Sequence, residues 1–250
     1  MEKLFSDVKN NLSFIGVCLL VFFAIFTIAS LSERFVFQKN IKKIGSAQKA
    51  AFIGLFSAVS GVLMLFEIPL FFAPAFYKID LSEIPVLMSA FYLGPVAGVV
   101  TELFKIIVKI MLKGTTTAFV GDFANFVIGC SFVLPAAIIY HIKKNKNTAL
   151  IGMAAGTVCM SVFGSLFNAV YLLPTFAVQF GLPLDVIIAM GTAINPAITS
   201  VSTLVLFAVV PFNILKGVVV SILTFFLYKR VECVLFRKDI DSGNANMAKS

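Results

Sequence analysis

Two asparagines and one lysine combine side-chain types that could recognise a flat polar ligand. Asn213 and Lys216 are three residues apart, so a helix would project both from the same face. Asn168 lies about five residues before the end of its own apolar segment, so it could reach the same depth. An asparagine amide offers a donor and an acceptor in one plane, whereas lysine only donates. These groups suit a heteroaromatic imide. The alternative for Lys216 is that its side chain extends to the lipid headgroups at the outer surface and contacts no ligand.

A charged segment interrupts the apolar sequence between residues 76 and 91. Ser82 could cap a helix that begins at Glu83, whose carboxylate would then favour the positive end of the helix dipole. The second interpretation is a loop over a pocket at the outer membrane surface, with Tyr77, Asp80 and Glu83 as ligand contacts. The two interpretations are compatible.

Three further side chains are candidates for ligand contact. Asp122 and Asn125 lie near the start of an apolar segment, where they could cap a helix or contact hydroxyl groups of a ligand. Tyr171, together with the abundant phenylalanines, could supply flat apolar walls, although phenylalanines of membrane helices more often face lipid or the core.

A stripe of charge follows one face of another apolar segment. Its members are spaced by three, four and four residues: Glu102, Lys105, Lys109 and Lys113. We expect Glu102 and Lys105 to form an internal pair, and the outer end of the stripe to reach towards water. The spacing alone assigns the stripe no role.

The composition places the chain in a lipid bilayer. Its 250 residues are 60% hydrophobic and 13% charged, and the mean hydropathy is +1.01. Soluble domains are about 45–50% apolar. Because a crossing needs about 20 apolar residues, we predict seven segments, the third of them short: 13–31, 47–66, 83–93, 96–112, 119–140, 149–173 and 204–228. Residues 174–200 would form a long connection or a re-entrant piece.

Basic residues predict the orientation. They cluster after the first, fifth and seventh segments, which indicates cytoplasmic positions there, a cytoplasmic carboxyl terminus and an external amino terminus. The first segment could instead be a secretory signal, but its apolar run is long and a basic cluster follows it. Tryptophan is absent, so we expect the five tyrosines to anchor the membrane interfaces.

Small residues recur every four positions in the second segment: Ala50, Gly54 and Ala58. Such a strip lets another helix approach closely. The partner could be a helix of the same chain or another protein.

Enzymatic motifs are missing from the sequence. It contains no GxxxxGK[ST] phosphate loop, no HExxH, no GxSxG and a single histidine. The four cysteines are isolated and fit reduced thiols. We therefore expect no enzyme, no metal and no cofactor, and no binding of nucleic acid despite the net charge of +8.

Four motifs occur in an order that resembles the riboflavin-specific S component (RibU) family of energy-coupling factor (ECF) vitamin importers. They are KIDLSEIPVL at 78–87, GPVAG at 94–98, NAVYLLP at 168–174 and VVPFNILKG at 209–217. The resemblance covers about residues 48–230. It implies a six-helix bundle that captures riboflavin at the outer surface, with flavin contacts at Asn168, Asn213 and Lys216.

The same resemblance implies partners. The strip with Gly54 and Ala58 would meet a shared membrane-embedded coupling subunit (T component), which two separate ATPase subunits drive. The first segment is an addition to the six helices of the family, and residues 174–200 look longer than usual.

We therefore expect an all-α membrane protein of the prokaryotic plasma membrane. Residues 1–45 would form the extra transmembrane helix and a basic linker, 46–232 the six-helix substrate-binding domain, and 233–250 a cytoplasmic tail. The alternatives are an S component for thiamine, folate or pantothenate, and a membrane scaffold protein without a ligand.

Overall fold

The computed structural model describes residues 2–36, 44–74, 76–115, 119–181 and 183–235. Three long helices come from the first half of the chain, separated by a polar loop and one short helix. In order, the elements are α1 (Glu2–Val36), α2 (Ser46–Leu63), β1 (Ile68–Pro69), β2 (Lys78–Ile79), α3 (Glu83–Leu93) and α4 (Pro95–Lys113). The basic residues Lys39, Lys42 and Lys43 and the expected tail beyond residue 235 lie outside the described residues.

The second half is built from three long helical stretches, two of which contain a π-helical turn. Its elements are α5 (Val120–Ile142), α6 (Lys146–Phe167), η1 (Asn168–Leu172), α7 (Leu173–Phe180), α8 (Leu184–Thr192), α9 (Val201–Leu204), η2 (Val205–Val209) and α10 (Val210–Leu235). The expectation of an all-α membrane protein is confirmed, apart from the two-residue antiparallel strands β1 and β2.

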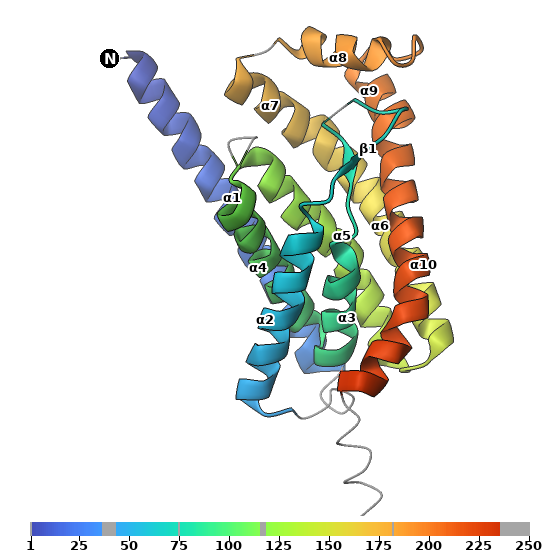
Figure 1. Ribbon diagram of the computed structural model, residues 1–250. Coiled ribbons are helices and arrows are strands. Elements are labelled where there is room, and N and C mark those ends of the chain that lie inside the picture. The colour runs from blue at the N-terminus through green and yellow to red at the C-terminus, as the bar shows by residue number, and fades with distance from the viewer. Residues whose placement is uncertain (1, 37–43, 75, 116–118, 182, 236–250) are drawn as a thin grey trace, which may run out of the picture.

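The helices form one bundle in which α1 lies against α4 and α5 (Figure 1). Within the described residues, five helices are long and apolar enough to cross a membrane: 16–34, 46–63, 120–142, 146–178 and 201–231. α3 has 11 residues, about 16 Å of helix, and cannot cross alone. The loop from α2 enters the bundle from the end where α8 lies, and α3 continues from it towards the other end (Figure 1).

Most predicted segments agree with the helices within a few residues, but α1 begins at Glu2 rather than residue 13, α10 ends at Leu235 rather than residue 228, and one further region differs. α3 begins and ends where the sequence predicted. Residues 174–200 are largely helical rather than a plain connection, because α7 continues α6 and α8 then lies across the end of the bundle (Figure 1).

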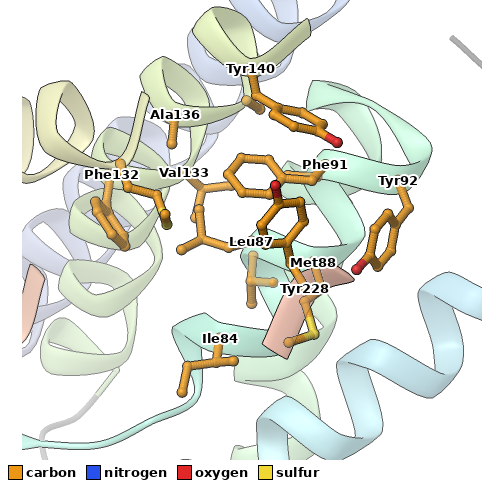
Figure 2. Close-up of a cluster of buried hydrophobic side chains, with 14 of the residues drawn as sticks. Ile84, Leu87, Met88, Phe91, Tyr92, Phe132, Val133, Ala136, Tyr140 and Tyr228 are labelled. Carbon is orange, nitrogen blue, oxygen red and sulfur yellow. The ribbon is translucent and has the colours of Figure 1, made fainter. Parts of the chain in front are cut away.

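The expectation about tyrosines is wrong for four of the five. Tyr77, Tyr92, Tyr140 and Tyr228 are buried in the bundle, and Tyr171 is half-buried. Figure 2 shows why two of them point inward: Tyr140 of α5 and Tyr228 of α10 pack around Phe91 of α3. The Phe91 ring centroid lies 4.4 Å from that of Tyr140 and 6.0 Å from that of Tyr228. This aromatic cluster fixes the short helix α3 between two long ones.

Two prolines account for the two π-helical turns. Pro174 and Pro211 each come two residues after such a turn, η1 and η2 respectively. A proline ring clashes with the carbonyl group four residues earlier and has no N–H to donate. In both places that carbonyl lies inside the π turn, and the wider turn accommodates the ring. The two turns also pack against each other.

Glycines allow α5 and α6 to approach closely. A Cβ atom on Gly156 would overlap the carbonyl oxygen of Phe132, and one on Gly152 would lie 2.6 Å from the carbonyl oxygen of Ala136. In a bilayer such close backbone contact is a main source of helix association, because lipid gives no hydrophobic drive between helices.

This contact predicts that Gly156→Leu destabilises the protein. We expect a loss of about 1–3 kcal/mol, seen as earlier thermal unfolding in detergent. Gly54→Leu is the matched control, since a Cβ at Gly54 meets no atom within 4 Å. Equal melting temperatures for parent and Gly156→Leu would contradict the close α5–α6 contact.

Candidate ligand-binding site

A cavity of about 560 Å³ opens near the end of the bundle that holds the α2–α3 loop. The loop, α5, the η1 region, α8 and α10 all contribute to its wall. Its polar lining residues are Glu67, Tyr77, Lys78, Asp80, Lys109, Asp122, Asn125, Asn168, Asn213 and Lys216. Seven of the nine candidate ligand contacts therefore share one cavity of a size typical for small-molecule sites.

Asn168 is the first residue of η1 and is buried. Its Oδ1 accepts a hydrogen bond from the Tyr77 hydroxyl group (2.9 Å), and its Nδ2 donates to the carbonyl oxygen of Gly164 (2.7 Å). An amide has two N–H donors and two acceptor lone pairs. Asn168 thus anchors the loop through Tyr77 and keeps one donor and one acceptor for a ligand.

Asn213 lies in the first turn of α10 and is also buried. Its Nδ2 has no hydrogen-bond partner among the described residues. A Cβ atom on Gly164 would come within 2.9 Å of this nitrogen, so glycine makes room for the amide. Both asparagine amides consequently meet at Gly164. A buried N–H without a partner is costly, which marks Asn213 as a group that a ligand would satisfy.

Lys216 follows one turn later on α10 and is paired with acids of the loop and α3. Its Nζ lies 3.3 Å from Asp80 Oδ2 and 3.6 Å from Glu83 Oε1. Two acids thus balance the ammonium group, and one of its three N–H donors remains for a ligand.

The capping interpretation of Ser82 needs correction. Ser82 makes no side-chain cap to α3; its backbone N–H instead donates to Asp80 Oδ1 at 2.9 Å, and its hydroxyl donates to the same oxygen. Asp80 therefore organises the turn that precedes α3. Its second carboxylate oxygen stays directed at Lys216.

The far side of the cavity carries a second ion pair. Lys109 Nζ lies 2.6 Å from Asp122 Oδ1, and both residues are buried. Asn125 lines the same wall and donates to the carbonyl oxygen of Gly121 at 3.1 Å, within its own helix. The ion pair with Lys109 accounts for the buried position of Asp122, which makes no side-chain cap to α5. It also shows that Lys109 faces the cavity, which sequence spacing did not reveal.

At the mouth of the cavity, Glu67 binds two lysines. Its Oε2 lies 3.0 Å from Lys78 Nζ and 2.8 Å from Lys113 Nζ. Partial burial alone would raise the pKa of the Glu67 carboxyl. The two ammonium groups have the larger effect, so that pKa lies below its usual value. The contacts connect the α2–α3 loop to the end of α4.

Two predicted contacts do not line the cavity. Glu83 points instead to Lys105, at 2.9 Å, and reaches the cavity only through Lys216. The Tyr171 ring packs on Phe167, with centroids 5.3 Å apart. The apolar wall includes Phe76, Phe176 and Phe212, which belong to the residue type expected there. Its other large members were not singled out from the sequence: Met64, Leu172, Leu173, Ile187 and Met190. Only the unexpected helical path of residues 173–192 brings Phe176, Ile187 and Met190 to the site.

The charge stripe of α4 faces inward along most of its length. The predicted Glu102–Lys105 pair is confirmed, with Lys105 Nζ 2.5 Å from Glu102 Oε1. Farther along α4 the partners are Asp122 for Lys109 and Glu67 for Lys113. The stripe therefore joins α4 to α3, α5 and the loop.

The small-residue strip of α2 lies on the surface. Ala50, Gly54 and Ala58 are exposed, whereas Ser57 and Ser60 on the other face are buried. Ser57 donates to the Thr101 carbonyl oxygen (3.4 Å) and Ser60 to that of Ser82. Among the described residues the strip has no helix packed into it at Gly54.

Comparison with known proteins identifies the family. A model of the ECF transporter substrate-specific component matches residues 48–228. The chain is 33% identical to the riboflavin transporter RibU of Staphylococcus aureus (strain TCH60), over 74% of this chain and 90% of that protein. It is 27% identical to the riboflavin transporter FmnP of Bacillus subtilis (strain 168), over 70% and 87%.

A solved structure is similar as well. It is described as "Structure and mechanism of the S component of a bacterial ECF transporter", with a TM-score of 0.60 and 30% identity over 76% of this chain and 99% of that chain. The matching region, residues 48–228, begins after α1 and includes the residues that line the cavity. The chain belongs to the family of ECF transporter substrate-specific components.

Proposed function

We propose that this S component binds riboflavin in the cavity between the α2–α3 loop and α10. The observation that carries the proposal is the buried Asn213 amide, which has no hydrogen-bond partner among the described residues and meets the Asn168 amide at Gly164. The names of the relatives support the same ligand, since both are riboflavin transporters. The chain is a transport component and not an enzyme.

The chemistry of the flavin ring fits these groups. The pyrimidine edge of isoalloxazine presents one N–H between two carbonyl oxygens. Asn213 offers a donor and an acceptor in one plane, and Lys216 offers a donor one helical turn away. Phe176, Ile187 and Met190 supply apolar surface for the ring. The ribityl hydroxyl groups would then meet the Lys109–Asp122 side and Asn125, where donors and acceptors alternate.

Delivery to the cytoplasm requires partners, because the sequence lacks a phosphate-binding loop for ATP. As an S component, the chain associates with an ECF module. We place the contact with the membrane-embedded T component at Ala50, Gly54 and Ala58, and ATP hydrolysis in two separate subunits. Exposure of these small residues supports that contact over packing within the chain.

The orientation is part of the proposal. The chain is a multi-pass membrane protein. The basic residues that cluster at the ends of α1, α5 and α10 support an orientation with the cavity outside and the carboxyl terminus in the cytoplasm of a prokaryotic cell. Figure 1 supports an odd number of passages, because the amino-terminal end of α1 lies opposite the last turn of α10.

The proposed ligand predicts a measurable role for Asn213. We expect purified parent protein to quench riboflavin fluorescence on binding, and Asn213→Ala to weaken binding roughly 5- to 150-fold, because losing one buried hydrogen bond costs about 1–3 kcal/mol. The control is Ser221→Ala on the same helix, a residue that does not line the cavity. Preference of the parent for thiamine, folate or pantothenate would assign another vitamin, and binding of none of them would indicate a scaffold protein.

The α2 strip predicts that binding and transport can be separated. Gly54→Leu should abolish riboflavin uptake in cells that contain the ECF module while leaving riboflavin affinity in detergent nearly unchanged, because the new side chain blocks helix approach. Val162→Leu, on an exposed face of α6, is the control and should keep both activities. Normal uptake by Gly54→Leu would move the docking surface elsewhere.

The orientation predicts the positions of both ends. A reporter enzyme fused after Ser250 should be active in the cytoplasm, and one fused before Met1 should be active outside, because seven passages separate them. If both reporters respond on the same side, α1 does not cross the membrane.

A further inference from the structure

Below the ligand cavity lies a group of five charged side chains that we name the buried charge cluster: Asp80, Glu83, Glu102, Lys105 and Lys216. Each is buried, with at most 6% of its surface exposed. Lys105 contacts Glu83 and Glu102, and Lys216 contacts Asp80 and Glu83. With every group ionised, three carboxylates face two ammonium groups. The cluster then has one negative charge in excess.

The elements packed around the cluster do not supply the missing positive charge among the described residues. α5 closes one side with Gly129 and the thiol of Cys130. The nearest other ammonium group along α4, Lys109, is paired with Asp122. An uncompensated carboxylate in a membrane-embedded core is strongly disfavoured, and such groups bind a proton or a cation instead.

The surplus is located at Glu83 and Glu102. Both carboxylates lie against Gly129: a Cβ atom there would overlap Glu102 Oε1 and come within 3.1 Å of Glu83 Oε1. The second oxygen of each, Oε2, is buried and has no hydrogen-bond partner in the described part of the chain. Because Gly129 has no side chain, the carboxylates of Glu83 and Glu102 can lie close together. Each keeps an oxygen without a hydrogen-bond partner among the described residues.

We propose that Glu83 and Glu102 together bind one proton, taken from water, and that this proton neutralises the cluster. A protonated carboxyl group is a hydrogen-bond donor, so the pair gains a bond as well as charge balance. The site is separate from the ligand contacts but adjoins them, because Lys216 belongs to both. With the proton bound, the remaining two carboxylates balance the two lysines. Lys216 then keeps its free donor for the cavity.

Infrared spectra of the full chain in detergent at neutral pH, recorded in H₂O and in D₂O and subtracted, test the site directly. We expect a carbonyl stretching band of a protonated carboxyl group, identified by its shift in D₂O. Glu102→Gln should remove this band, and Glu83→Gln should also remove it, since either change leaves two carboxylates and two ammonium groups. Glu67→Gln is the control and should retain the band, because Glu67 is paired with two lysines near water.

Each variant alone removes the surplus charge, so the test can still be read if only one of the two variants folds. Persistence of the band in either folded variant would overturn the proposal. If both variants fail to fold, the parent decides: absence of a deuterium-sensitive carboxyl band at neutral pH overturns the proton site. A parent without that band whose melting temperature rises with Na⁺ but not with K⁺ would assign a sodium ion in place of the proton. None of these results depends on which vitamin binds.

Discussion

The ammonium group of Lys216 must be neutralised, and this requirement shapes the region around the cavity. A lysine in the middle of a membrane-spanning helix, here 201–231, is tolerated only with partners. Those partners come from the loop, through Asp80, and from α3, through Glu83. Removing one member of a buried ion pair costs about 3–5 kcal/mol. The ion pair between Asp80 and Lys216 therefore helps to hold the loop against α10. The cavity wall and the fold therefore depend on the same charge.

Helix α2 connects this region to the proposed docking surface. One face buries Ser60, which donates to the Ser82 carbonyl oxygen, beside the turn that Asp80 organises. The opposite face exposes Gly54 and Ala58. A partner on the outer face would thus lie one helix diameter, about 10 Å, from the loop that covers the cavity. The 18-residue helix α2 therefore contributes to both surfaces.

Sequence patterns predicted most helices and most of the polar residues that line the cavity, for identifiable reasons. α3 was predicted to the residue because Gly94 and Pro95 end it and a charged turn precedes it. Asn213 and Lys216 share a face because helical spacing is local. Pairings between distant segments, such as Lys109 with Asp122, could not be predicted, since they depend on how α4 and α5 pack. The burial of Tyr140 and Tyr228 has the same cause: a cluster with Phe91 outweighs the usual preference of tyrosine for the membrane interface.

The π-helical turns have a consequence for how specificity can change. Each residue of an α-helix advances about 100° around the axis, and a π turn contains one residue more than the α turn it replaces. Deleting a single residue from 205–209 would rotate α9 and the end of α8 relative to Asn213. The residues that line the cavity would keep their identity, and only their orientation would change. Met190 and Ile187 would then present different surfaces to the ligand. Insertions and deletions at such turns give this fold a route to new ligands that point substitutions do not provide.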